Sequence, residues 1–234
     1  MAQAAAASGV HTVVCTPHLP DMDETVIERA REAVGAVRAA LETAELELKL
    51  LLGFEVDLAV AATCAPAALA ELAIESSEGA IVLETPFHGW PPFMEETVFR
   101  LSAAGLRPVL AHPERNDRVQ ETPELLTGCV KAGAVVQATV ASTLGEFGRE
   151  AEKFFFRLLS EGWVSLLATD AHAYRTDGWT LTSSLERLRG LLSDKDVSRL
   201  VEENPGRLLR GEALLKLSAA RGSGSAIRRT WRQK

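Results

Sequence analysis

The sequence has little cysteine, no long apolar run and no excess of positive charge. Its 234 residues include three cysteines, Cys15, Cys64 and Cys129, which are odd in number, widely spaced and not in a Cys-x-x-Cys arrangement. This pattern gives neither a disulfide framework nor a zinc knuckle, and it fits a reducing compartment. A membrane-spanning helix would need about 18 consecutive apolar residues, and no such run is present. Because the first residues also lack the basic stretch of a signal peptide, we expect a cytoplasmic protein.

Two nucleophile motifs are also missing. A cysteine-based phosphatase needs an arginine six positions after its cysteine, and those positions hold Asp21, Ala70 and Val135. The Gly-x-Ser-x-Gly turn of serine hydrolases is absent as well. The sequence therefore excludes a phosphatase that uses a cysteine in this motif and gives no sign of a serine elbow.

Net charge and composition limit the kind of partner and the number of domains. The formal net charge is −7 at pH 7, and 47% of the residues are hydrophobic. A nucleic-acid-binding surface is usually strongly basic, so we expect no nucleic-acid partner. Any anion must then be bound by a local cluster of metal ions or arginines. We expect one domain with a full core over residues 1–217, followed by a basic flexible tail over residues 218–234.

Apolar runs that end in a histidine, aspartate or glutamate recur along the chain, with helix-type segments between them. This alternation favours a single α/β barrel of parallel strands, in which the carboxyl ends of the strands gather at one rim. A sixth run, Ala134–Val140, is predicted to be a strand without an obvious ligand, and Ala61–Ala73 a helix with Pro66 in its first turn. The five runs that end in a ligand-capable residue are His11–His18, Lys49–Glu55, Ala80–Glu84, Arg107–Glu114 and Val164–His172.

The side chains at these strand ends have the chemistry of a metal centre. Three imidazoles and three carboxylates suit a cluster of two or three divalent ions such as Mn, Fe or Zn. Such ions lower the pKa of bound water and supply a hydroxide nucleophile, so that hydrolysis needs no protein nucleophile. Each residue alone could instead make a structural hydrogen bond, but recurrence at five strand ends favours the metal centre. The six predicted ligands are His18, Glu55, Glu84, His112, Asp170 and His172.

Two arginines follow predicted ligands at the same spacing. Arg115 lies three residues after His112, and Arg175 lies three residues after His172. A guanidinium group offers a planar pair of donors to two phosphate oxygens, so both are predicted to bind a phosphate. His88 lies in a Pro- and Gly-rich loop after Glu84 and is predicted to line the substrate pocket rather than to bind metal.

Catalytic roles are predicted for Arg115, His112 and Asp170. Asp170 and His172 are expected to point to the same side, because residues i and i+2 of an extended segment share a face.

Five motifs together resemble the PHP-domain metal-dependent protein-tyrosine phosphatases of bacterial capsule and exopolysaccharide clusters. They are Gly9–His18, Leu51–Val56, Ile81–Phe87, Pro108–Asn116 and Ala168–His172, and the resemblance runs from residue 1 to about residue 210. It implies a distorted TIM-like (β/α)7 barrel of the PHP type with a trinuclear metal site. It also implies removal of phosphate from tyrosines on a partner tyrosine kinase that controls polysaccharide export. By position, the six ligands above would hold the metals, and Arg115 would bind phosphate.

One feature of that family is not found in this sequence. The family begins with a strand that carries His-x-His and, shortly after it, an Asp, and no such segment is present here. Either the reading frame starts upstream of Met1, or the first strand is truly missing and an unpaired sheet edge and weak activity are expected.

Three functional interpretations stay open from the sequence. The first is phosphotyrosine hydrolysis. The second is a PHP-type phosphatase of a small phosphomonoester such as histidinol phosphate. The third is a catalytically impaired PHP fragment that binds a kinase or simply persists. A homo-oligomer is compatible with each of them.

Overall fold

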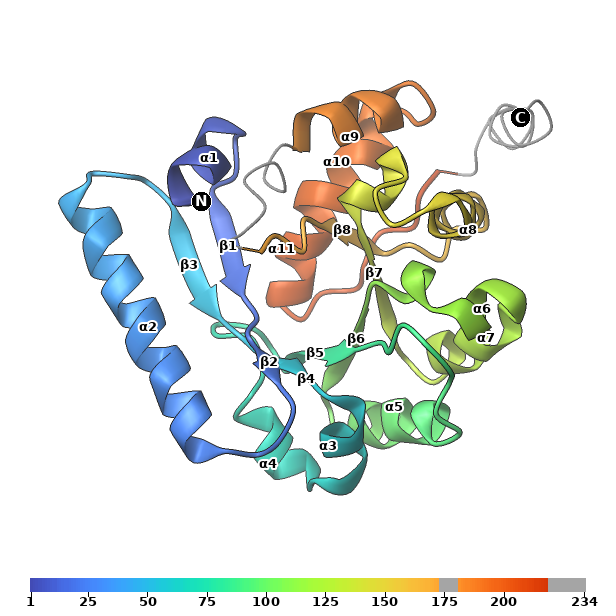
Figure 1. The fold of residues 1–234 in the computed structure, drawn as a ribbon, viewed down its shortest axis with the longest axis horizontal. Helices are drawn as coiled ribbons and strands as arrows, with labels where there is room; N and C mark the ends of the chain where they lie inside the picture. The colour runs from blue at the N-terminus through green and yellow to red at the C-terminus, as the bar shows by residue number, and fades with distance from the viewer. Residues whose placement is uncertain (173–180, 219–234) are drawn as a thin grey trace.

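The strands of the computed structural model, which describes residues 1–172 and 181–218, are all paired in parallel. Strand β1 (Thr12–Cys15) pairs with β3 (Lys49–Leu52). The larger sheet has the order β2-β4-β5-β6-β7-β8 (Figure 1). Its strands are β2 (His18–Leu19), β4 (Glu55–Val56), β5 (Ala80–Glu84), β6 (Arg107–Ala111), β7 (Val135–Thr139) and β8 (Leu166–Ala168). The predicted α/β class with parallel strands is confirmed.

The two sets of strands form one continuous layer. Only two residues separate β1 from β2, and only two separate β3 from β4. Across these gaps the Gly53 amide donates to the Cys15 carbonyl at 2.9 Å, and the Glu55 amide donates to the Pro17 carbonyl at 3.0 Å. The parallel pairing of β1 with β3 therefore continues into the pairing of β2 with β4, and His18 lies at the start of β2.

Side chains along each central strand alternate between two apolar clusters, because successive residues point to opposite faces of a sheet. The outer cluster, beneath the helices, includes Ile81, Leu83, Leu110, Val136 and Leu167. The inner cluster includes Val82, Val109, Val135 and Leu166, with Leu51 of β3 and Leu208 of α11 (Asn204–Leu209). The sheet is therefore buried on both faces, as its nearly continuous apolar strands predict.

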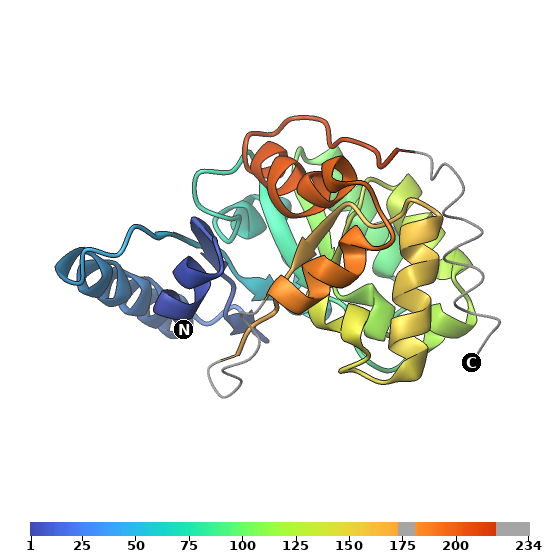
Figure 2. The same ribbon diagram turned by 90° about the horizontal axis from the view of Figure 1, so that it is seen from above.

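Helices cover the outside of this sheet, and α1, α2, β1 and β3 project to one side (Figures 1 and 2). The helix α2 begins after Asp23, whose carboxylate accepts a hydrogen bond from the Thr25 amide at 2.8 Å. The helices are α1 (Ala2–Ala7), α2 (Glu24–Thr43), α3 (Leu58–Thr63), α4 (Pro66–Ala70), α5 (Met94–Ala103), α6 (Asp117–Glu121), α7 (Glu124–Lys131), α8 (Arg149–Ser160), α9 (Leu181–Arg189) and α10 (Asp194–Ser198). Short 3₁₀ segments η1 (Pro113–Arg115) and η2 (Val140–Leu144) follow β6 and β7, and the π-helical η4 (Arg199–Glu203) precedes α11.

The sheet is strongly curved, but a closed barrel is not confirmed. Leu51 and Leu166, from strands near its two ends, share the inner cluster. The rings of His18 on β2 and His172 beyond β8 have centroids only 6.2 Å apart. Within residues 1–172 and 181–218, however, no hydrogen-bonded ladder joins β8 to β1 or β2. The predicted (β/α)7 closure and the missing first strand both stay predictions.

The single helix predicted over Ala61–Ala73 is wrong. The chain forms α3 and α4 instead, and Cys64 and Ala65 between them are extended, with ψ values of 151° and 140°. The ring of Pro66 disfavours helical geometry in the residue before it and supplies no amide donor, so one helix ends and another begins there.

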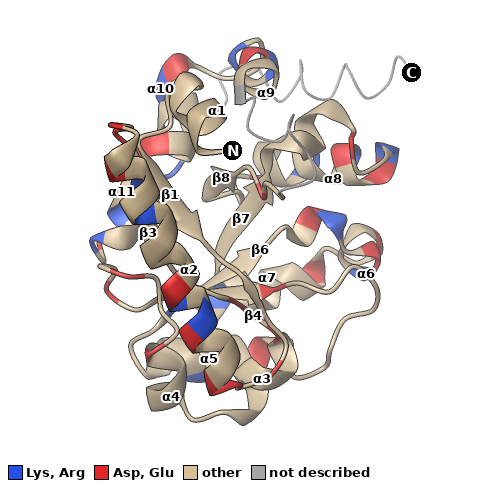
Figure 3. Cartoon of the chain, turned by 60° about the vertical axis from the view of Figure 1, so that its left-hand side comes forward, with Lys and Arg blue, Asp and Glu red and all other residues tan. Residues whose placement is uncertain are grey.

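None of the described helices combines the length and apolar character that crossing a bilayer requires. Basic and acidic residues are interspersed on the helices that surround the sheet (Figure 3). Arg175 and residues 219–234 of the predicted tail lie outside the described residues.

Candidate metal centre

The strand register places His18, Glu55 and Glu84 on the same face of the sheet. His18 of β2 lies opposite Glu55 of β4, and Glu55 lies opposite Val82 of β5. Glu84 follows Val82 by two residues and therefore points to the same side. That side is the inner face, because Val82 belongs to the inner cluster. Three residues that are far apart in sequence thus meet at the carboxyl ends of adjacent strands.

The three side chains lie close enough to share one ion. One ligand atom from each of His18, Glu55 and Glu84 lies within 4.8 Å of the other two. His18 Nδ1 lies 3.4 Å from Glu84 Oε2. One imidazole and two carboxylates form a donor set that suits Mn, Fe or Zn, so these residues fit the predicted divalent cation.

His112 joins this cluster through an unusual backbone conformation. Its Nε2 lies 3.0 Å from Glu55 Oε1, and both side chains are almost fully buried. The preceding Ala111 belongs to the inner cluster, so regular alternation would point His112 outward. His112 instead has φ +41°, in the left-handed region that non-glycine residues rarely adopt. Such strain is concentrated at functional sites, and here it accompanies the contact between His112 and Glu55.

Glu55 and His112 stabilise each other's charged forms. Burial alone would raise the pKa of the Glu55 carboxyl, but the hydrogen bond from His112 and the positive charges of nearby histidines lower that pKa overall. Burial alone would lower the pKa of His112, but the hydrogen bond and negative charge of Glu55 raise it overall. Glu55 is therefore ionised at neutral pH, which is the form that binds a cation.

Asp170 and His172 reach the site from the loop after β8. Asp170 has φ +50°, so Asp170 and His172 do not belong to one extended strand as expected, although their side chains lie near each other. His172 Nδ1 donates to the Asp170 carbonyl oxygen at 3.0 Å, which leaves the Nε2 lone pair as the ligand atom. This backbone hydrogen bond is typical of metal-binding histidines. The His172 ring lies beside His18, as given above, so His18, Glu55, Glu84, His112 and His172 converge. Asp170 lies next to them, with its Oδ1 3.9 Å from His172 Nδ1.

Buried polar atoms without a partner gather at the same strand ends. Among the described residues, four of the six such side-chain atoms are Thr85 Oγ1, His112 Nδ1, Glu114 Oε2 and Thr139 Oγ1. Native structures pair nearly all buried polar groups, so this concentration indicates a functional site. The other oxygen of Glu114 accepts from the Thr139 amide at 2.9 Å and the Ser142 hydroxyl at 2.7 Å. Glu114 thereby fixes η1 against the end of β7.

Arg115 lies at the edge of the cluster and is held on three sides. Its Nη1 donates to Asp170 Oδ2 at 2.8 Å, and the two side chains are 18% and 15% exposed. Its guanidinium carbon lies 4.3 Å from the ring centroid of Phe87 and 3.9 Å from that of Phe147. These are cation–π distances. The predicted phosphate-binding group is therefore fixed in orientation and linked to a predicted ligand.

One of the predicted substrate-binding residues, His88, lies outside this cluster. Arg175 lies outside the described residues. The side chain of His88 is 88% exposed, and its Nδ1 lies 3.0 Å from Asp117 Oδ2. Phe87 and Phe147 were not predicted as site residues, because neither can bind a metal and both lie in segments that follow strands.

Two of the three cysteines, Cys15 and Cys129, have thiols that resist deprotonation. Burial raises the pKa of the Cys129 thiol to about 12, and burial also raises the pKa of Cys15. Both thiols are therefore protonated near neutral pH, whereas nucleophilic attack requires a thiolate. This agrees with the absence of the Cys-x5-Arg motif.

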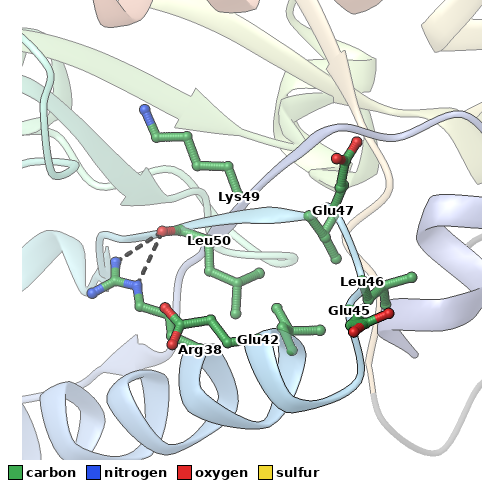
Figure 4. Close-up of a pocket in the computed structure, with 9 residues that line it drawn as sticks. Arg38, Glu42, Glu45, Leu46, Glu47, Lys49 and Leu50 are labelled. Atoms are coloured by element: carbon green, nitrogen blue, oxygen red, sulfur yellow. Dashed lines mark hydrogen bonds between the residues drawn. The ribbon is translucent and has the colours of Figure 1, made fainter.

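A cavity of about 480 Å³ lies elsewhere, between the carboxyl end of α2 and β3 (Figure 4). Arg38, Glu42 and Lys49 contribute to its wall. Arg38 donates to the Leu50 carbonyl at 2.8 and 3.2 Å and pairs with Glu75, so it links α2 to β3. None of the six predicted ligands lines the described part of its wall. This cavity is separate from the candidate metal centre.

The protein has an α/β fold with a curved parallel sheet. Histidines, carboxylates and a fixed arginine lie together at the carboxyl ends of its strands, so the protein is of the class with a candidate divalent-metal centre at this position. The chain belongs to the family described as Capsular polysaccharide synthesis, CpsB/CapC, whose model matches residues 1–210. The resemblance predicted from the sequence is therefore confirmed.

Two curated relatives are phosphatases by name. The chain is 29% identical over 217 residues to Tyrosine-protein phosphatase YwqE of Bacillus subtilis (strain 168), and the match covers 92% of this chain and 85% of that protein. It is 25% identical over 217 residues to Putative tyrosine-protein phosphatase CapC of Staphylococcus aureus, over 90% of this chain and 80% of that protein.

The fold also matches a solved structure of this family. The matching chain comes from the crystal structures of YwqE from Bacillus subtilis and CpsB from Streptococcus pneumoniae, described as unique metal-dependent tyrosine phosphatases. The TM-score is 0.80 at 28% sequence identity, and the match covers 94% of this chain and 88% of that chain. The likeness therefore extends over nearly the whole described fold.

Proposed function

We propose that this chain is a metal-dependent phosphatase that hydrolyses phosphotyrosine on a protein substrate. The observation that carries the proposal is the convergence of His18, Glu55 and Glu84 within 4.8 Å, next to a fixed arginine. Membership of the CpsB/CapC family and the tyrosine-phosphatase names of the relatives support the same activity.

The residues of the site divide into two groups by chemistry. His18, Glu55, Glu84, His112, Asp170 and His172 would hold two or three divalent ions, with Mn, Fe or Zn as the candidates. A divalent cation bound there supplies a water-derived nucleophile at neutral pH and withdraws charge from phosphoryl oxygens. Glu55 and His112 fix the inner wall of the site, and Glu114 anchors the segment that carries His112 and Arg115.

Arg115 would bind and orient the phosphate. Asp170 occupies one of its donors, and no second hydrogen bond from Arg115 to the described residues is present. The remaining N–H groups of its guanidinium therefore face no competing acceptor in this part of the chain. The N–H groups of a guanidinium lie in its plane, where a phosphate can accept two of them, and the rings of Phe87 and Phe147 hold the group in place.

A phenolic leaving group suits this set of residues. The hydroxyl of tyrosine has a pKa of about 10, so its phenolate is a better leaving group than an aliphatic alkoxide. The ester bond can therefore break with little help from a protein acid.

We further propose that the protein substrate is a tyrosine kinase of capsular or exopolysaccharide synthesis. We also propose that the curved sheet forms a distorted (β/α)7 barrel.

The proposal is tested by phosphate release from a phosphotyrosyl peptide. The protein is stripped with a chelator and then assayed alone and with added Mn²⁺, Fe²⁺ or Zn²⁺. We expect activity to disappear on chelation and to return with at least one of these ions. Activity that survives complete removal of metal would contradict the proposal.

Parallel assays separate the alternative substrates. Histidinol phosphate and a phosphoseryl peptide are assayed under the same conditions. A higher kcat/KM on histidinol phosphate would replace the protein substrate by a small phosphomonoester. Full metal binding without release of phosphate from any of the three would indicate an impaired enzyme.

A further inference from the structure

The loop that leaves the candidate ligand Glu84 is bound firmly to the start of α6. Asn116 Nδ2 donates to the Pro86 carbonyl at 2.6 Å and to the Gly89 carbonyl at 2.7 Å. The Asp117 amide donates to the Phe87 carbonyl at 3.1 Å, and the Gly89 amide donates to Asp117 Oδ1 at 3.0 Å. Four hydrogen bonds over four residues fix this backbone, so the position of Phe87 is set by the fold.

The ring of Phe87 lies beside the candidate metal centre and is partly exposed to solvent. Its centroid lies 4.3 Å from the guanidinium carbon of Arg115 and 5.4 Å from the centroid of the His112 ring. Phe87 is nevertheless 43% exposed, one of the few large apolar residues of the described chain that is so accessible. A fixed, exposed aromatic surface therefore adjoins the group that would hold the phosphate.

This surface matches one part of an aryl phosphate. A phosphate that accepts hydrogen bonds from Arg115 at 2.7–2.9 Å would carry its ester group past the neighbouring Phe87 ring. Aromatic rings attract each other at centroid separations of 4.5–7 Å, and an alkyl group lacks that edge-and-face complementarity. We propose that Phe87 determines specificity by contacting the phenyl ring of the substrate, so that the site selects aryl over alkyl phosphomonoesters. This inference rests on the proposed phosphatase function.

A merely structural role for Phe87 makes a different prediction. If its ring only holds Arg115 in place, its loss weakens the binding of every phosphate-like ligand equally. If its ring contacts the substrate, its loss weakens aryl ligands alone. The ratio of the affinities for an aryl and an alkyl ligand therefore distinguishes a structural role of Phe87 from contact with the substrate. This ratio can be measured without catalytic turnover.

The experiment measures binding of phenylphosphonate and methylphosphonate to the Mn²⁺-loaded protein by titration calorimetry. Wild-type protein is compared with Phe87→Ala and Phe87→Tyr. Phe99→Ala, which removes another exposed phenylalanine on α5, is the matched control. We expect wild type to prefer phenylphosphonate, and Phe87→Ala to reduce that preference about two- to tenfold. Phe87→Tyr and Phe99→Ala should retain it.

Each other result has a definite meaning. No preference in wild type, an unchanged preference in Phe87→Ala, or an equal loss for both ligands would overturn the inference. Selective binding through Phe87 without release of phosphate from a phosphotyrosyl peptide would uphold it and overturn the proposed function. If the protein hydrolyses that peptide but Phe87→Ala leaves the preference for phenylphosphonate unchanged, the proposed function is upheld and the inference about Phe87 is overturned.

Discussion

Asn116 is predicted to be one of the most sensitive residues outside the predicted ligands. Its side chain is completely buried and makes three hydrogen bonds. Oδ1 accepts from the Val119 amide at 2.8 Å and caps α6, while Nδ2 donates to the Pro86 and Gly89 carbonyls. One side chain therefore joins the start of α6 to the loop that carries Phe87.

The cost of Asn116→Ala follows from these contacts. Loss of a helix cap costs about 1 kcal/mol. Each of the two donated hydrogen bonds contributes about 1 kcal/mol, and more where the carbonyl is left buried without a partner. We expect the free energy of unfolding to fall by about 3 kcal/mol. Asn116→Ser keeps a capping oxygen but cannot reach both carbonyls, so it should lose about 1 kcal/mol less.

Urea denaturation followed by circular dichroism measures both losses. Asp23→Ala, which removes the exposed cap of α2 and nothing buried, is the control, and it should cost clearly less than Asn116→Ala. If Asn116→Ala costs no more than Asp23→Ala, the two carbonyl contacts do not stabilise the loop, and the argument for a fixed Phe87 fails.

Two further predictions concern charged groups. Arg115→Ala should lower kcat/KM for a phosphotyrosyl peptide by about ten- to a hundredfold, because hydrogen bonds to a charged ligand contribute about 1.5–3 kcal/mol. The control is Arg118→Ala, which removes an exposed arginine and should change kcat/KM little. Equal losses of kcat/KM in the two variants would contradict the role of Arg115. Burial alone would raise the pKa of Asp196, but hydrogen bonds from Ser218, Ser193 and Arg199 lower it overall. Its stabilisation is then present above an unfolded-state pKa of about 3.9 and is lost as the pH falls through the folded-state pKa. Urea titrations of Asp196→Asn should therefore show a deficit at pH 7 that shrinks in acid, and a deficit independent of pH would exclude this contribution.

The strands and the convergence of ligands were predictable because both follow from simple geometry. Apolar runs that are buried on both faces give parallel strands, and the carboxyl ends of parallel strands meet at one edge. His18 and Glu55 lie in the short strands β2 and β4 that continue β1 and β3, Glu84 ends β5, and the register brings the three together. The position of a residue at a strand end can therefore be predicted once the order of the strands is known.

Contacts that depend on backbone turns and on loops were not predictable in the same way. His112 and Asp170 both have left-handed backbone conformations. Histidine and aspartate adopt this region more often than most non-glycine residues, but only in a small minority of cases, so residue type alone does not locate it. The contact of Arg115 with both Phe87 and Phe147 joins three separate loops, so no spacing in the sequence indicates it. The break before Pro66, by contrast, could have been predicted from the proline itself.

Anomalous X-ray scattering from crystals soaked in Zn²⁺ tests the central claim most directly, because it locates the ion without reference to activity. We predict a peak at about 2.0–2.2 Å from ligand atoms of His18, Glu55 and Glu84. Peaks only at other positions, with no density among these three side chains, would contradict the claim that the strand ends form a metal centre.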